Sequence, residues 1–212
     1  MNTEEENPFL NRIAPPDNGV PQKEPLPKSD RAIVPFNPKT GFEFRDIDGM
    51  LRAANCYLQS GFAPSHIRKA QQLIVLWAQA AEMGVGPMTA INKMSVIGNK
   101  AGPMTELALA LVEQRGLLED TPRVEYSGEG DDSKCTVTVQ RKGRKSSQSW
   151  SFSMKDAKTA NLIKPGSAWI TYPEDMLYAR AMGRALHRVF PDVMAGMYTA
   201  EELSDFPQEN NR

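Results

Sequence analysis

The chain has 212 residues, 40% of them hydrophobic, and a formal net charge of −1, a composition typical of one globular domain with extensions. Two cysteines without CxxC spacing and two histidines, His66 and His187, give no support to a disulfide framework or a zinc site. The acidic N-terminus lacks the basic start and apolar run of a secretory signal, and the apolar stretch 73–83 is too short to span a membrane. We therefore expect a cytoplasmic protein without membrane contact.

An unstructured arm is predicted first, over residues 1–41, where eight prolines occur with little hydrophobic periodicity. A helix is then predicted after the N-cap candidate Asp46, with its end at Gly61. A second helix is predicted from about Ser65 to Met83, because apolar residues recur at three-and-four spacing and Gly84 follows.

Shorter elements follow. A helical turn is predicted after Pro87, and then a small hairpin that turns at Gly98–Asn99. The next helix, 105–114, is predicted to be capped by Thr105 and to end at Gly116.

Three strands are predicted over 123–126, 135–140 and 149–152, because apolar and polar residues alternate along them, most clearly in the second. This alternation is typical of an antiparallel sheet with one buried and one wet face. Ser153 is expected to cap a short helix, 154–161, before the long final helix.

The order of these elements predicts the α+β class, with a small antiparallel β-sheet and hairpins packed against several helices. A disordered proline-rich arm (1–41) is expected to precede a single core domain over 42–203. A short acidic tail over 204–212 is expected to follow the core.

The segment Trp169–Pro191 is predicted to contain one long helix, with Glu174 and Asp175 at its start, whose basic face lies opposite its apolar face. At 100° per residue, one arc is apolar and the other carries Arg180, Arg184, His187 and Arg188. No acidic residue lies among them, whereas a helix that needs only solubility usually mixes charges on its wet face. Such a surface favours a polyanion, although the arginines of a solvated face can also pair with acids elsewhere in the fold.

Charge in the neighbouring sequence favours the polyanion. From Lys134 to Arg188, eleven basic residues stand against three acidic ones, although the whole chain is nearly neutral. The tip between the last two predicted strands contributes Arg141, Lys142, Arg144 and Lys145 to this excess. A charged tip also protects edge strands from aggregation, so this signal is weaker when taken alone.

Aromatic residues are interleaved with these cations, and flat side chains can stack on unpaired bases. Trp150 and Tyr178 are expected in the core, because one lies in an alternating strand and the other on the apolar arc. Trp169 and Tyr172, near Lys164, are equally compatible with base stacking and with packing of their loop.

The sequence contains no recognisable catalytic constellation. Neither GNKAGPMT nor RKGRKSS has the spacing of a phosphate-binding loop. Glu174 and Asp175 are interpreted as helix-capping acids, and His187 among arginines suits a backbone or phosphate contact better than general-base work. We therefore predict no enzyme activity, no cofactor and no metal.

Two long runs carry a resemblance to a known family. GVGPMTAINKMSVIGNKAGPMTELALALVEQRG and, after the strands, WITYPEDMLYARAMGRALHRVFPDVMAGMYTAEE resemble the RecT family of phage recombination proteins, which belongs with Red-beta among single-strand annealing proteins. The resemblance spans Phe42 to Leu203 in order and leaves out the arm and the last few residues.

The resemblance implies an ATP-independent protein that coats single-stranded DNA, pairs complementary strands, and assembles as rings or helical filaments. It also implies a narrow basic groove, for which Arg180 and Arg184 are the best matches by position, followed by Lys100 in the small hairpin. Family members recruit a phage exonuclease or a host single-strand-binding protein, but this chain has only a short acidic extension where longer members carry a partner-binding domain.

The leading hypothesis is single-stranded DNA binding and annealing by a homo-oligomer that also holds the annealed duplex. An Mg²⁺-dependent phage nuclease using Asp46, Asp48, Glu174 and Asp175 is the alternative from the enzyme class, and an RNA-binding regulator is the third. The candidate DNA contacts are Lys100, Arg141, Lys142, Arg144, Lys145, Lys164, Trp169, Tyr172, Arg180, Arg184, His187 and Arg188.

Overall fold

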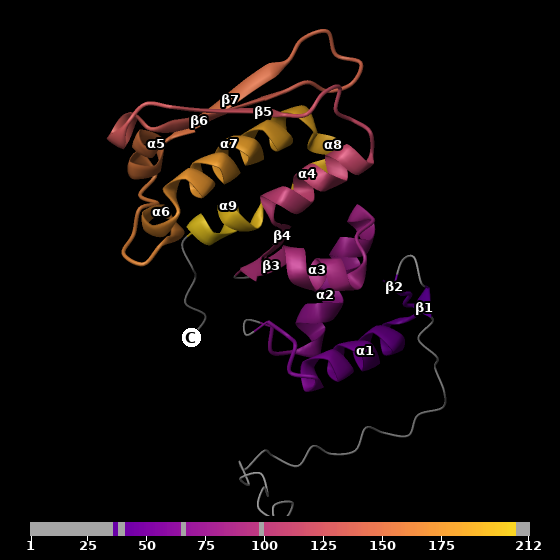
Figure 1. Ribbon diagram of the computed structural model, residues 1–212. Helices are drawn as coiled ribbons and strands as arrows, with labels where there is room; N and C mark the ends of the chain where they lie inside the picture. Colours follow the sequence, from indigo (N-terminus) through magenta and orange to yellow (C-terminus); the bar gives the residue numbers. More distant parts are fainter. Residues whose placement is uncertain (1–35, 38–40, 65–66, 98–99, 207–212) are drawn as a thin grey trace, which may run out of the picture. The chain divides into compact units, whose positions relative to one another are not determined.

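The computed structural model describes residues 36–37, 41–64, 67–97 and 100–206 (Figure 1). The predicted arm therefore lies outside the described residues, except for its last part, which forms a small hairpin. The elements are β1 (Phe36–Asn37), β2 (Gly41–Phe42), α1 (Ile47–Gln59), α2 (Ala70–Met83), α3 (Pro87–Lys93), β3 (Met94–Ile97), β4 (Lys100–Pro103), α4 (Thr105–Gln114), β5 (Arg123–Ser127), η1 (Gly130–Asp132), β6 (Lys134–Val139), β7 (Gln148–Ser153), α5 (Met154–Thr159), α6 (Ala168–Thr171), α7 (Pro173–Val189), α8 (Pro191–Met194) and α9 (Ala200–Asp205). These helices and small antiparallel sheets confirm the α+β class.

Helix α1 begins where the sequence predicts, because the Asp46 carboxylate accepts a hydrogen bond from the Gly49 amide at 2.6 Å. Helix α2 begins at Ala70, later than predicted. The side-chain oxygen of Gln72 accepts from the Arg68 and Lys69 amides, and this contact fixes the first turn there. The helix ends at Gly84 as predicted, with φ at 77°.

The predicted small hairpin is confirmed, since β3 and β4 pair antiparallel with Ile97 opposite Lys100; its turn, 98–99, lies outside the described residues. Helix α4 follows, but its cap differs from the prediction. Thr105 is the first helical residue, and its amide and hydroxyl donate to the Glu201 carboxylate at 3.1 and 2.8 Å. A residue 96 positions away therefore satisfies this helix end.

Strands β5, β6 and β7 form one antiparallel sheet in that order, which confirms the three predicted strands within two residues at each end. The alternation on β6 places Cys135, Val137 and Val139 on the buried inner face. Trp150 and Phe152 of β7 share this face, because they pair with Val137 and Cys135. The outer face is polar.

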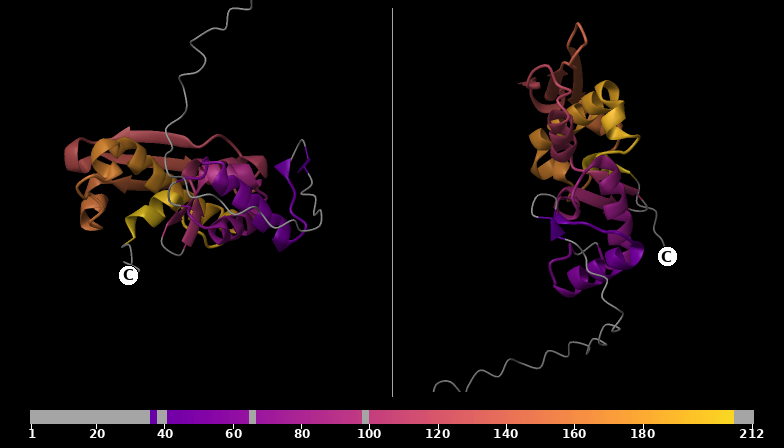
Figure 2. Two further views of the ribbon diagram at one scale, coloured as in Figure 1. Left: turned by 90° about the horizontal axis from the view of Figure 1, so that it is seen from below. Right: turned by 90° about the vertical axis from the view of Figure 1, so that its right-hand side faces the viewer.

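Helix α7 packs against β6 and β7, and it contacts α4 and α9 as well (Figure 1). Figure 2 shows α7 along the sheet from two further directions. Nine of its seventeen residues are buried, including Ala181, Met182 and Leu186, so the apolar arc predicted for this segment is its core face. Strand β5 is exposed along its whole length.

The helix predicted within Trp169–Pro191 is confirmed as α7, but the residues before it, predicted as a loop, form the short helix α6 and a break at Tyr172. Tyr172 has φ −137° and ψ 60°, a non-helical conformation that suits the residue before Pro173. The chain turns again at Pro191 into α8 and then forms α9, which the sequence analysis does not predict as a helix. Helix α9 runs past the predicted end of the core at Leu203.

Candidate nucleic-acid interface

Three arginines form a row along α7 at one-turn spacing. Arg180, Arg184 and Arg188 lie four residues apart, so successive Cα atoms are about 6 Å apart along the helix axis. Arg184 and Arg188 are exposed, and Arg180 is half-buried. We call these three residues the arginine row.

Strand β7, which is an edge of the sheet, holds the guanidinium groups of the row. The Cζ atom of Arg184 lies 4.4 Å from the ring centre of Phe152, and that of Arg188 lies 5.0 Å from the ring of Trp150. Arg184 also donates to the Ser151 carbonyl at 2.7 Å. Each of these two cations lies over a ring, and its guanidinium keeps further N–H donors that suit a phosphate.

The three arginines of the row differ in whether a carboxylate neutralises their charge. Arg180 lies 3.5 Å from the Asp205 carboxylate of α9, and burial is the main cause that raises the pKa of this carboxyl group. Within the described part of the chain, neither Arg184 nor Arg188 forms an ion pair with a carboxylate. The row therefore presents two uncompensated cations and a third that is shared with α9.

His187 is paired with an acid instead of facing solvent alone. Its Nε2 atom lies 2.8 Å from the Glu202 carboxylate, which also accepts from the Thr199 amide at 2.9 Å. Burial opposes ionisation of Glu202, but these hydrogen bonds outweigh it and lower the pKa of the carboxyl group. Because Gly183 has no side chain, Glu202 reaches α7; a Cβ there would lie 3.1 Å from its Oε1. The predicted phosphate contact of His187 is therefore corrected to a hydrogen bond between α7 and α9.

Arg141 is also corrected, from a predicted DNA contact to a structural brace. Its guanidinium donates to both carboxylate oxygens of Asp192 at 2.5 and 2.9 Å, and to the Val189 carbonyl at 3.0 Å. The hydrogen bond from Arg141 lowers the pKa of Asp192 to about 2. This brace joins the end of β6 to the end of α7.

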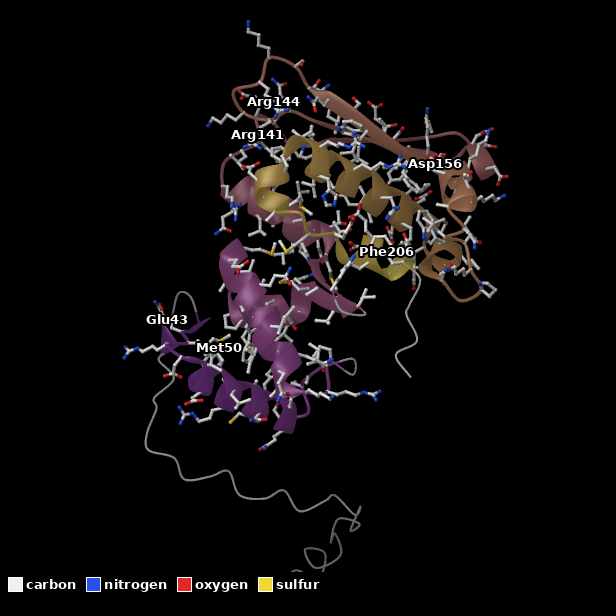
Figure 3. All side chains as sticks on the ribbon, turned by 180° about the vertical axis from the view of Figure 1, so that it is seen from behind. Glu43, Met50, Arg141, Arg144, Asp156 and Phe206 are labelled. Atoms are coloured by element: carbon white, nitrogen blue, oxygen red, sulfur yellow. The ribbon has the colours of Figure 1, made fainter. Side chains whose placement is uncertain are left out.

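The other cations of the predicted tip remain available. Lys142, Arg144 and Lys145 are exposed in the loop between β6 and β7. Figure 3 shows Arg141 and Arg144 at the same end of the sheet, with Asp156 at the opposite end. Because Arg141 binds the carbonyl next to Arg188, the tip lies at the Arg188 end of the arginine row.

The two aromatic candidates for base stacking, Trp169 and Tyr172, differ in their exposure to solvent. Trp169 is 2% exposed, lies 5.6 Å from the ring of Phe152, and donates to Asp205 at 3.2 Å, so it packs in the core and cannot stack on a base. Tyr172 is 62% exposed in the break between α6 and α7, and Lys164 is exposed nearby in sequence. The alternative that the sequence left open is thus settled for Trp169 in favour of packing.

Trp150 and Lys100 occupy surroundings that the sequence does not indicate. Trp150 packs on the core as predicted, and it also supports Arg188. Lys100 lies over the rings of Tyr198 and Phe206, at 5.2 and 5.3 Å from their centres. Nothing in the sequence pattern indicates Tyr198 and Phe206, because their common surface forms only when the chain after α8 returns to the small hairpin.

The acids considered for a nuclease serve other purposes. Asp46 caps α1, and Glu174 and Asp175 lie in the first turn of α7. In the described ranges, no cluster of three or more histidine, cysteine, aspartate or glutamate side chains is placed to hold a metal ion. Both cysteines, Cys56 and Cys135, are free. None of the helices in the described residues has the length and apolar character needed to cross a bilayer.

The comparisons with protein-family models and with curated proteins give no match for this chain.

Proposed function

We propose that the protein binds single-stranded DNA through its phosphates along the arginine row and anneals complementary strands without ATP, as a ring or filament in the cytoplasm during phage recombination. One observation carries the proposal: Arg184 and Arg188 are exposed, held in place by aromatic rings, and free of carboxylate partners among the described residues. A helix that needs only solubility gains nothing from fixing two like charges side by side.

The geometry supports a backbone contact without base reading. The side chains of the row are fixed at one-turn intervals beside an edge strand, and the tip cations Lys142, Arg144 and Lys145 extend the charge from the Arg188 end. Such a strip binds successive phosphates of one strand and leaves its bases outward, ready to pair. No covalent step is required, because concentrating the strands and screening their repulsion accelerate pairing. The resemblance of the two long runs to the RecT family supports the same function.

The candidate DNA contacts proposed from the structure differ from those predicted from the sequence. Arg184 and Arg188 replace Arg180 and Arg184 as the principal pair, because Arg180 is shared with Asp205. Lys142, Arg144, Lys145, Lys164 and Tyr172 stay as secondary candidates.

The test replaces Arg184 and Arg188 together by glutamine and measures binding of fluorescent oligothymidylate over a series of salt concentrations. The slope of log affinity against log salt should flatten by about 0.7 for each phosphate that the variant no longer neutralises, and affinity should fall for every sequence tried. Arg123→Gln is the matched control, because Arg123 is an exposed arginine of the same sheet whose partner Thr138 faces away from α7. Unchanged binding by a folded double variant would remove the arginine row from the proposal.

A second assay separates annealing from the alternatives. Labelled complementary strands are mixed with the protein, with and without Mg²⁺, and no nucleotide is added. Faster duplex formation supports annealing, whereas shortening of the strands in Mg²⁺ would indicate a nuclease. Preference for one RNA loop without dependence on DNA length would indicate an RNA-binding regulator.

A further inference from the structure

Two exposed aromatic rings meet at a right angle next to α9. Tyr198 is 43% exposed and Phe206 is 39% exposed, and their ring centres lie 5.0 Å apart with an interplanar angle of 89°. Aromatic side chains of this size usually bury more of their surface, and both rings that form this corner keep a part of theirs in solvent. Figure 3 shows Phe206 at the end of α9, beside α7 and away from the sheet.

A cation lies in this corner. The Nζ atom of Lys100 on β4 is 5.2 Å from the centre of the Tyr198 ring and 5.3 Å from that of Phe206. On the other side, the ring of Tyr198 lies 6.1 Å from the ring of His187. His187 lies on α7, the helix that carries the arginine row, so the corner lies next to that helix.

The backbone beneath Tyr198 is held rigidly. A Cβ atom added at Gly102 of β4 would lie 2.2 Å from the Tyr198 carbonyl oxygen, so the two backbones are in direct contact. Thr199, the next residue, is fully buried and caps α9 through its hydroxyl group. The backbone that carries the Tyr198 ring is therefore positioned before any ligand binds, which lowers the entropy cost of stacking on the ring.

We propose that the corner of Tyr198, Phe206 and Lys100 binds a nucleobase of single-stranded DNA, with Lys100 contacting the adjacent phosphate. The inference rests on the proposed function, because it places a base subsite next to the phosphate contacts of the arginine row. Partly exposed aromatic rings beside a flexible cation are the combination that sequence-independent strand binding uses, since every base has a π face. The site therefore takes any base and requires that the strand be unpaired.

The experiment uses the full chain and two fluorescent strands of equal length, an oligothymidylate and the same backbone with abasic units. Tyr198→Ala should weaken binding of the oligothymidylate roughly 5- to 100-fold while leaving the abasic strand nearly unaffected, because the abasic strand has no base to stack on the ring. Tyr198→Phe keeps the ring and should restore binding. Lys100→Gln should flatten the salt slope by about 0.7 on both strands.

Tyr126→Ala is the matched control, since Tyr126 is also an exposed tyrosine but lies on β5, outside the candidate DNA contacts. Circular dichroism and a thermal melt establish that the variants fold. Equal losses of affinity on both strands, or no loss for a folded Tyr198→Ala variant, would overturn the base subsite and leave the phosphate contacts intact. If the wild-type protein bound neither strand, both the base subsite and the proposed function would be overturned.

Discussion

Four arginines of this protein occupy two kinds of surroundings, and the difference decides what each can bind. All four lie over aromatic rings, but Arg141 and Arg180 also face carboxylates, at 2.5 and 3.5 Å, whereas Arg184 and Arg188 face none among the described residues. A ring stabilises a guanidinium by about 0.5–1 kcal/mol at an exposed site without removing its charge. The first pair therefore holds elements together, and the second pair remains attractive to an anion.

Trp169 allows a direct test of packing against stacking. Replacing it by phenylalanine removes its hydrogen bond to Asp205 and part of its buried surface, and the free energy of unfolding should fall by about 1–3 kcal/mol. Affinity for single-stranded DNA should not change, because the ring is inaccessible. Urea unfolding and anisotropy titration of the same preparation check both statements. A weakened affinity in a variant that remains folded would return Trp169 to the binding surface.

At the scale of elements, contacts between distant segments replace local signals. Local rules predict the small hairpin, the three strands and the capping of α5 by Ser153, because each depends on residues within a few positions. The sequence does not predict that Glu201 caps α4 or that α9 covers Arg180 and His187. These contacts depend on where the chain returns after α8, and no local periodicity encodes that return.

The cap that Glu201 provides for α4 should contribute measurably to the free energy of unfolding. Glu201→Ala leaves the Thr105 amide without its acceptor and should lower the free energy of unfolding by about 0.5–2 kcal/mol. Glu201→Gln keeps an acceptor oxygen and removes the charge that favours a helix N-terminus, so its destabilisation should be smaller, about 0.3–1 kcal/mol. Urea titration of both variants measures the difference. If both Glu201 variants lost equally little unfolding free energy, the contact between Glu201 and Thr105 would not act as a helix cap.

At the scale of the whole molecule, the arrangement of charge matters more than its sum. The sequence assigns the acidic C-terminal residues to a tail separate from the basic surface, but Glu202 and Asp205 fold back onto α7 as part of α9. The near-neutral total therefore includes acids placed directly on the basic helix. Acidification removes the charge of Asp205 before that of Glu202, because the pKa of Asp205 is raised and that of Glu202 is lowered.

Acid stability should depend on the brace between Arg141 and Asp192. The folded pKa of Asp192 is about 2, below the ordinary value of about 4 in an unfolded chain, so the ionised group favours folding at neutral pH. This stabilisation is present above about pH 4 and disappears as the pH falls towards 2. Asp192→Asn should flatten the dependence of unfolding free energy on pH in that window, measured by urea titration. Asp120→Asn, on the exposed loop before β5, is the control and should retain the wild-type slope.

Asp205 should make strand binding depend on pH through Arg180. Burial raises the pKa of its carboxyl group despite Trp169, Arg180 and Lys164, so on acidification it loses its charge at a higher pH than an ordinary aspartate. Arg180 is then released to bind a phosphate, and affinity for single-stranded DNA should rise as the pH falls.

Asp205→Asn removes that competition at every pH. It should bind about 1.5- to 5-fold more tightly at neutral pH, the worth of one partly exposed charge pair. Its salt slope should be steeper by about 0.7, because one further phosphate is neutralised. Its affinity should also change less with pH than that of the wild type. The wild type and the Asp205→Asn variant both contain His187 and Glu202. The difference between their pH profiles of affinity therefore reports on Asp205. Parallel profiles with equal salt slopes would mean that Arg180 stays committed to the fold and that the phosphate path runs over Arg184 and Arg188 alone.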